Sequence, residues 1–201
     1  MKRGVVIVFV KAPVAGRVKT RLGAEIGMGR ATALFRIMTA RTIGEAMKGG
    51  WRVVLAVDPP GAACATAKFW PAGIERAPQG GRDLGARMSR AFREAPRGPV
   101  VIIGADAPGL RARHLRQAFD ALKGADAVFG PAADGGYWLI GLARRRAAPM
   151  LFEGVRWSTK HALADTLRTM PGNFNVRLLE TLRDIDEACD LGVLGPYAAA
   201  H

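Results

Sequence analysis

Cysteine is scarce in this 201-residue sequence, with only Cys64 and Cys189, which stand in unrelated contexts. A disulfide framework or a zinc site needs cysteines or histidines at defined spacing, so this sequence implies neither. Aromatic residues make up only 7% and occur mostly inside apolar runs. Proteins that stack bases on aromatic side chains interleave them with basic residues, and this pattern is missing.

Long apolar segments are also missing. The first apolar run, VVIVFV at 5–10, is followed at once by Lys11. It is shorter than the apolar core of a secretory signal and far shorter than a membrane span of about 20 residues. We therefore expect a first β-strand here, no membrane span, and a cytoplasmic protein.

Acidic residues are outnumbered, since 17 Asp and Glu face 30 Lys and Arg, for a net charge of +13. A basic surface attracts anions such as nucleotides, phosphosugars or nucleic acid. Solvated arginines on helix faces account for most of the excess. The charge alone leaves open a nucleotide-binding or nucleic-acid-binding protein without catalysis, although the aromatic pattern argues against nucleic acid as a partner.

Apolar runs of strand length alternate with segments of helical periodicity. Continuous apolarity indicates strands that are buried on both faces, as in α/β sheets. The predicted strands are 5–10, 52–57, 100–105, 126–131 and 137–142. The predicted helices are 30–48, 84–95, 111–123, 159–170 with Ser158 as N-cap, and a short 187–191.

This alternation predicts an α/β fold: one domain over 1–201, with three α/β/α layers around a mixed, mostly parallel sheet. The strands 126–131 and 137–142 are too close in the chain for a crossover, which favours an antiparallel pair. Binding sites of such sheets lie at the carboxyl ends of the strands. The loops that follow the apolar runs are therefore the candidates for chemistry.

The first of these loops, KAPVAGRVKTRL at 11–22, carries four cations in twelve residues. Lys and Arg at this spacing can converge on phosphate oxygens, and Gly16 permits a close backbone approach. The loop lacks the spacing of the P-loop and of the dinucleotide-binding glycine motif. We interpret it as a diphosphate-binding loop of another kind.

Two carboxylates stand near the ends of later strands. Asp106 in GADAPGL follows the strand at 100–105, and Asp134 in ADGGY precedes the strand at 137–142. Magnesium often takes one or two protein carboxylates together with phosphate oxygens, so Asp106 suits a metal site. Taken alone, an aspartate here is more often a turn or helix cap.

Other polar segments give weaker signals. The glycine-rich APQGGRDLGARM at 77–88 precedes a predicted helix, and RWSTKHA at 156–162 surrounds Trp157. The charge run ARRR at 143–146 is interpreted as a solvated loop, and His114, His161 and His201 as surface residues. Acidic residues gather in RDIDEACDL at 183–191, where Asp184 or Asp186 is, like Asp134, a candidate second metal ligand.

Six segments in this order resemble one family. They are KAPVAGRVKTRL, QGGRDLGARM, GADAPGL, GPAADGGYWLIGL, LFEGVRWST and RDIDEACDL. Together they are similar to the small bacterial GT-A-type transferases usually described as glycosyltransferases, some of them in arsenosugar biosynthesis. That family is related to 2-phospho-lactate guanylyltransferase and molybdenum-cofactor guanylyltransferase. One departure is Arg82, because the family more often has glycine there.

The resemblance implies a nucleotide-diphospho-sugar transferase-like (GT-A) fold, a bound nucleotide, and a divalent metal, Mg²⁺ or Mn²⁺, on the aspartate that matches Asp106. It also implies phosphate binding by Lys19 and Arg21. The resulting site predictions are catalysis by Asp106, Asp134 and Lys19, nucleotide or phosphate binding by Lys11, Gly16, Lys19, Thr20, Arg21, Gln79 and Asp83, an acceptor pocket of Gly135, Gly136, Tyr137, Trp157 and Ser158, and metal binding by Asp106.

The predicted function is a metal-dependent transferase that uses a nucleotide. Transfer of a sugar from a nucleotide-diphosphate sugar to a small acceptor comes first. The alternative is nucleotidyl transfer, in which a phosphorylated small molecule attacks a nucleoside triphosphate and pyrophosphate leaves. In both reactions negative charge builds on a diphosphate, which cations stabilise.

Overall fold

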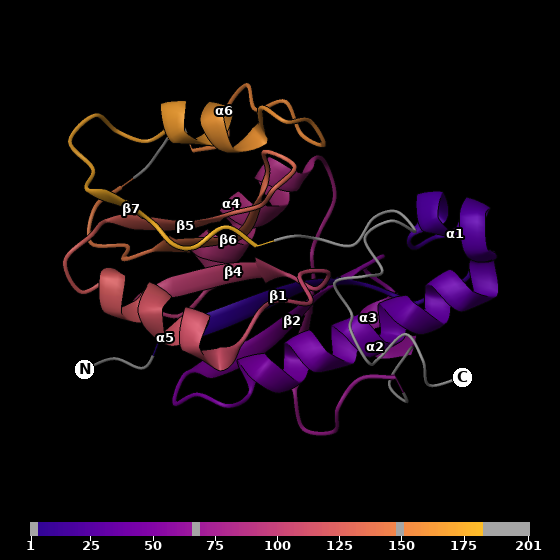
Figure 1. The fold of residues 1–201 in the computed structure, drawn as a ribbon. Helices are drawn as coiled ribbons and strands as arrows, with labels where there is room; N and C mark the ends of the chain where they lie inside the picture. Colours follow the sequence, from indigo (N-terminus) through magenta and orange to yellow (C-terminus); the bar gives the residue numbers. More distant parts are fainter. Residues whose placement is uncertain (1–3, 66–68, 148–150, 183–201) are drawn as a thin grey trace.

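The computed structural model describes residues 4–65, 69–147 and 151–182. Over these residues seven strands form one sheet in the order β3-β2-β1-β4-β6-β5-β7 (Figure 1). The strands are β1 (Val5–Lys11), β2 (Arg52–Asp58), β3 (Glu75–Pro78), β4 (Val100–Gly104), β5 (Ala127–Pro131), β6 (Tyr137–Leu142) and β7 (Val176–Leu178).

The sheet is mixed and mostly parallel, as predicted. Strand β1 runs parallel to β2 and β4, β2 to β3, and β5 to β7, while β6 runs antiparallel to both β4 and β5. The antiparallel β5–β6 pair confirms the prediction from the short connection between the two runs.

Helices cover both faces of the sheet and complete three layers (Figure 1). The helices are α1 (Thr20–Ile26), α2 (Met28–Ala46), α3 (Ala62–Ala65), α4 (Leu84–Glu94), α5 (Ala112–Ala121) and α6 (Ala162–Arg168). In the described part of the chain, no helix is both long enough and apolar enough to cross a membrane.

Alternate residues of each central strand face the two helical layers, because successive side chains of a strand point to opposite faces. Val6 and Val8 of β1 join a buried cluster with α2, α3 and α5. Val5 and Ile7 join a second cluster that contains Met88 of α4, and Leu163 and Leu167 of α6 pack against this cluster. Both faces are thus buried, which explains why the strand sequences are continuously apolar.

The structure also contains elements that the sequence patterns did not predict. These are α1, α3 and the two short outer strands β3 and β7. The predicted N-cap Ser158 is wrong, because α6 begins at Ala162 with His161 as its N-cap. The predicted helix at 187–191 lies outside the described residues.

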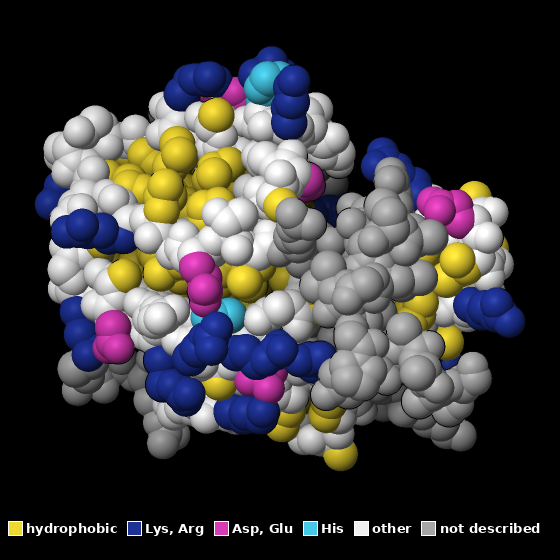
Figure 2. All heavy atoms as spheres, in the orientation of Figure 1, with side chains coloured by type: hydrophobic (Ala, Val, Ile, Leu, Met, Phe, Trp, Pro, Cys, Tyr) yellow, Lys and Arg dark blue, Asp and Glu magenta, His cyan; other side chains and the backbone are white. Residues whose placement is uncertain are grey.

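The surface supports the assignment of many arginines to solvated helix faces. Figure 2 shows Lys and Arg side chains gathered over α5 and the adjoining part of α2. Arg113 and Arg116 of α5 are exposed there. Much of the net positive charge therefore belongs to helix surfaces.

Candidate functional site

The predicted loops meet at one edge of the sheet, which we call the carboxyl edge. Strands β1, β2 and β4 are parallel, so the segments after Lys11, Asp58 and Gly104 leave the sheet at the same side. Because Ile103 near the end of β4 pairs with Leu139, the segment before β6 lies at this side too. The topology thus brings the cationic loop and the loops of Asp106 and Asp134 to one edge.

A direct contact joins two of these loops. Lys19 Nζ donates a hydrogen bond to Asp106 Oδ2 at 3.3 Å, across 87 residues of sequence. The Lys19 side chain is only 6% exposed, whereas that of Asp106 is 45% exposed. The ammonium is therefore enclosed by protein, and the carboxylate keeps a surface open to solvent.

The backbone of the cationic loop is held in an unusual conformation. Lys19 adopts a left-handed backbone conformation with φ 45° immediately before α1, and Gly16 has φ 76°. The left-handed region is costly for residues other than glycine and is often found at functional sites. Val18 and Leu22 are buried and fix the loop to the protein, while Arg17 and Arg21 are exposed.

Further predicted residues lie at the two ends of this loop. Lys11 is the exposed last residue of β1 and stands in register with Asp58. Thr20 is the exposed first residue of α1. Both therefore lie on the segment that carries Lys19, on its solvent side.

Helix α2 supports the loop that carries Asp106. Thr42 Oγ1 donates to the carbonyl of Ala105 at 3.3 Å, and Glu45 Oε2 accepts the backbone N–H of Ala112 at 2.8 Å. A hydrogen bond from Lys48 is the main reason that the pKa of Glu45 is lowered, so this carboxyl stays ionised and can hold the start of α5. Helix α2 thus supports the segment that carries Asp106, although its sequence pattern predicts only that it packs against the core.

Glycine at position 104 leaves room for the Asp106 carboxylate. A Cβ built on Gly104 would lie 3.0 Å from Asp106 Oδ1, tighter than nine in ten real contacts of a Cβ atom. A larger residue in place of Gly104, the last residue of β4, would therefore press against the Asp106 carboxylate.

The loop after β3 is fixed by a network that involves Arg87 and Asp58. The guanidinium of Arg87 lies 3.3 Å from Asp58 Oδ1 and 3.3 Å from Gln79 Oε1, and its Nε donates to the carbonyl of Arg82 at 3.1 Å. Neither Asp58 nor Arg87 is among the residues predicted from the sequence. Asp58 directly follows the apolar run 52–57, and this position after a strand is the sequence feature that could have marked it as a site residue.

Gln79 and Asp83 also have structural partners. Gln79 is buried, and its amide donates to the carbonyls of Val10 at 3.0 Å and Ala56 at 2.9 Å. Asp83 is the N-cap of α4 and accepts the backbone N–H of Ala86 at 2.8 Å. These contacts shape the loop, and nucleotide binding by the two residues stays a prediction.

The turn before β6 carries Asp134. Asp134 is exposed, and its Oδ1 accepts the backbone N–H of Gly136 at 2.8 Å. Gly135 has φ 87°, and a Cβ there would lie 2.2 Å from the carbonyl oxygen of Lys160. Glycine at position 135 is thus required by the turn and by its close contact with the 156–162 segment.

The other three residues of the predicted acceptor pocket belong to the segments around this turn. Tyr137 is half-buried, its hydroxyl accepts from Thr166 Oγ1 at 3.4 Å, and burial raises its pKa well above the ordinary range. Trp157 lies 6.5 Å from the Tyr137 ring and covers Gly85, where a Cβ would approach it to 2.9 Å. Ser158 is exposed with φ 58°. Tyr137 therefore contributes packing and a neutral hydroxyl.

The exposed carboxylate of Asp106 is the feature of this edge that suits a divalent metal. Magnesium is commonly held by one or two carboxylates and substrate phosphates, and Asp106 offers one exposed carboxylate beside cations suited to phosphates. The described residues contain no cluster of three or more metal-ligating side chains. Two of the candidate second ligands, Asp184 and Asp186, lie outside the described residues.

The surface assignment of His114 is wrong. Its side chain is fully buried, Nδ1 accepts the backbone N–H of Arg111 at 3.1 Å, and Nε2 contacts Glu180. Burial is the main cause that lowers the pKa of His114, so the imidazole is neutral near pH 7. The residue links the start of α5 to the segment after β7 and is structural.

The charge run at 143–146 lies in a loop in which Arg145 and Arg146 are exposed, as interpreted from the sequence, but its arginines also hold backbone groups of the protein. Arg144 donates to the carbonyls of Pro96 at 2.6 Å and Ala95 at 3.2 Å, beyond the end of α4. Arg145 donates to the carbonyls of Leu122 at 2.9 Å and Ala125 at 2.6 Å, beyond α5. These arginines hold backbone carbonyls of the segments that follow the two helices.

Known structures share this fold. A protein of Desulfovibrio desulfuricans, provisionally described as a nucleotide-diphospho-sugar transferase, is 30% identical over 98% of this chain and 88% of its own, with a TM-score of 0.89. Rv0371c of Mycobacterium tuberculosis, in a complex with manganese, is 19% identical over 96% of this chain and 97% of its own, with a TM-score of 0.59. The 4-diphosphocytidyl-2C-methyl-D-erythritol synthase of Anaerococcus prevotii is 10% identical over 99% of this chain and 97% of its own, with a TM-score of 0.63.

The fold is therefore that of the nucleotide-diphospho-sugar transferases, and the class is a transferase. Residues 42–159 match the model of a bacterial protein family, and the chain belongs to that family, "Uncharacterized protein conserved in bacteria (DUF2064)". Among curated proteins, no match to the chain was found.

Proposed function

We propose that this protein is a metal-dependent transferase that moves a sugar from a nucleotide-diphosphate sugar to a small acceptor at the carboxyl edge. The contact between Lys19 and Asp106 carries the proposal. It places a nearly enclosed cation and a partly exposed carboxylate side by side, next to further cations. This is the combination that a diphosphate with a bound divalent cation requires.

In this reaction the acceptor oxygen attacks the anomeric carbon, and the nucleoside diphosphate leaves. Lys19 and Arg21 would hold the leaving diphosphate, and their charges would stabilise it as the bond breaks. Lys19 is well suited to this because its ammonium is fixed by the Asp106 contact. A divalent metal bound by Asp106 would add further neutralisation of the diphosphate charge.

Asp134 is assigned to the acceptor side. One of its oxygens is held by Gly136, so its orientation is set, and the other is available to receive the proton of an acceptor hydroxyl. Trp157, which lies on the neighbouring segment, would provide an apolar surface for the acceptor. A carboxylate positioned in this way can act as a general base in group transfer.

The 30% identical relative supports sugar transfer, since that protein is provisionally described as a nucleotide-diphospho-sugar transferase. Nucleotidyl transfer is the second candidate. The exposed Arg17 and Arg21 beside Lys19 favour it, because they provide cations for a third phosphate. A structure with this fold in complex with CTP, at 11% identity, is that of a CMP:2-keto-3-deoxy-manno-octonic acid synthetase.

A thermal-shift panel of nucleoside triphosphates and nucleotide-diphosphate sugars, each with and without Mg²⁺ or Mn²⁺, tests the proposal. A ligand that binds the folded state alone raises the unfolding midpoint. We expect a metal-dependent shift with at least one nucleotide-diphosphate sugar. Shifts with triphosphates alone would favour nucleotidyl transfer, and no shift with any nucleotide would refute both candidates.

A further inference from the structure

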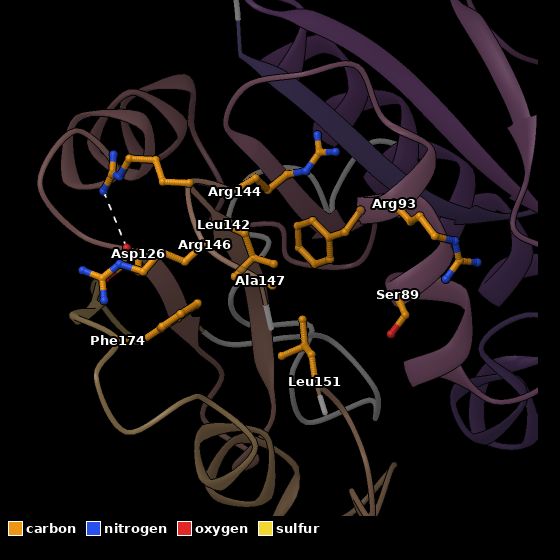
Figure 3. Close-up of a pocket in the computed structure, with 11 residues that line it drawn as sticks. Ser89, Arg93, Asp126, Leu142, Arg144, Arg146, Ala147, Leu151 and Phe174 are labelled. Carbon is orange, nitrogen blue, oxygen red and sulfur yellow. Dashed lines mark ion pairs between the residues drawn. The ribbon is translucent and has the colours of Figure 1, made fainter. Parts of the chain in front are cut away.

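A cavity of about 640 Å³ lies between α4 and the end of β6 (Figure 3). One of its walls is Leu142, the last residue of β6, which pairs with Val100 at the start of β4. Since Asp106 follows the other end of β4, this cavity is at the opposite edge of the sheet. Its lining residues are Ser89, Phe92, Arg93, Asp126, Leu142, Arg144, Arg145, Arg146, Ala147, Leu151 and Phe174.

Most polar groups of this cavity already have partners within the protein. Arg144 and Arg145 bind carbonyls beyond α4 and α5, as described above. Arg146 donates to the carbonyl of Asn173 at 2.9 Å and lies 3.5 Å from Asp126. Asp126 is buried and also accepts the backbone N–H of Asn175 at 3.0 Å. These groups build the wall of the cavity.

Two polar groups of the lining differ from these. Ser89 and Arg93 make no side-chain hydrogen bond or ion pair with any residue of the described ranges. They stand four residues apart on α4 and so lie on one face of that helix. Figure 3 shows Leu142 and Leu151 across the cavity from Ser89, and the exposed Arg93 on the same helix with its guanidinium directed away from these two leucines, at the outer border of the cavity.

The rest of the cavity is apolar. Phe92 and Leu142 form its buried wall, and Leu151 and Phe174 are half-buried at its border. The volume falls within the range of small-molecule sites, which combine apolar walls with a few polar groups that fix orientation. Four arginines against one aspartate make the lining basic.

We propose that this cavity is a second ligand site, separate from the carboxyl edge, for a small organic anion with an apolar body. The anionic group is held by the Arg93 guanidinium and the Ser89 hydroxyl, and the apolar body packs against Phe92, Leu142 and Leu151. The ligand class comprises aromatic or aliphatic carboxylates and phosphate monoesters, which share this chemistry.

Four probes test the proposal by isothermal titration. Phenyl phosphate and benzoate each combine an anion with an apolar ring, inorganic phosphate lacks the ring, and benzyl alcohol lacks the charge. We expect at least one of the two aromatic anions to bind about tenfold or more tightly than both single-feature probes. The tighter of the two identifies the ligand as a phosphate ester or a carboxylate. Equal affinity for aromatic anions and benzyl alcohol would overturn the proposal.

Variants locate the binding. Arg93→Ala should weaken binding of the better aromatic anion about tenfold, the effect of losing about 1.4 kcal/mol. Ser89→Ala should weaken it a few-fold, and Arg93→Lys should retain part of it. The matched control is Arg90→Ala on the same helix, since Arg90 pairs with Glu94 at 2.7 Å and is not part of the lining.

A further control separates the two ends of the molecule. Lys19→Met should leave this binding unchanged, because Lys19 lies at the carboxyl edge. Affinity that is unchanged in Arg93→Ala, or lost in Lys19→Met, would show that the probe binds elsewhere and would overturn the assignment.

Discussion

Lys19 Nζ lies 3.3 Å from Asp106 Oδ2, and this contact joins the loop after β1 to the loop after β4. The two residues differ in exposure, 6% for the Lys19 side chain and 45% for that of Asp106. The Lys19 ammonium is therefore held in a fixed position beside the site, and the Asp106 carboxylate keeps a larger surface open to a ligand.

Asp106→Asn should abolish metal-dependent turnover and change stability little. The amide keeps the size of the side chain and can still accept from Lys19, but it loses the charge that a divalent cation needs. The midpoint of urea unfolding and the turnover of the nucleotide identified by thermal shift are the measurements. An equally active Asp106→Asn enzyme would rule out the metal assignment.

Lys19→Met and Arg21→Ala should each weaken nucleotide binding about tenfold or more, because each removes a charge-assisted phosphate contact. Methionine preserves the packing of the enclosed Lys19 stem. Affinity is measured by isothermal titration, with Arg116→Ala on the exposed face of α5 as the control. If both variants bind as tightly as Arg116→Ala, the cationic loop does not bind phosphate.

Gly135→Ala should destabilise the protein by about 1–3 kcal/mol and lower turnover. Its φ of 87° disfavours alanine, and the new methyl group would lie 2.2 Å from the Lys160 carbonyl oxygen. Displacement of that turn would also move Asp134. Gly124→Ala is the matched control, because a Cβ at Gly124 has nothing within 4 Å. Similar unfolding midpoints for the two variants would contradict this account of the turn.

Stability should fall on acidification through the His114 imidazole. Burial outweighs the opposing charge of Glu180, and Arg113 and Arg111 add to the lowering of the pKa. The unfolded chain, with an ordinary pKa of about 6.5, therefore binds a proton that the folded protein rejects. The stability contributed by the neutral imidazole is present above about pH 6.5 and is lost as the pH falls below it.

His114→Gln tests this pH dependence. Glutamine at the third helical position can still accept the backbone N–H at the start of α5, but it does not titrate. Thermal unfolding at about pH 7.5 and about pH 5.5, on either side of the ordinary histidine pKa, should show a larger loss of midpoint for the wild type than for His114→Gln. Equal losses would show that another group causes the acid sensitivity.

The central strands could be predicted from the sequence because burial on both faces leaves a continuous apolar run. The outer strands β3 and β7 could not, since ERAP and VRL contain no such run and become strands by pairing with β2 and β5. The loops of the candidate site can be predicted from their positions next to strand ends, and the structure brings these loops to one edge of the sheet. The direction in which the strands pair brings these loops to one edge, whatever contacts their side chains make.

The sequence patterns do not predict which side chains contact one another. His114 packs beside Trp138, whose ring centroid lies 5.6 Å away, and contacts Glu180, which is distant in the chain. Arg87 likewise acquires its role from Asp58 and Gln79, two residues on other segments. Both are consequences of tertiary packing, which a single sequence does not encode in local spacing.

The most direct measurement is isothermal titration of the wild type and Asp106→Asn with the nucleotide-diphosphate sugar selected by thermal shift, with and without Mg²⁺. The proposed site predicts that Mg²⁺ tightens binding to the wild type about tenfold or more, a gain of about 1.4 kcal/mol, and has no such effect on Asp106→Asn. Equal Mg²⁺ dependence in the two proteins would contradict the assignment of the carboxyl edge as a metal–diphosphate site.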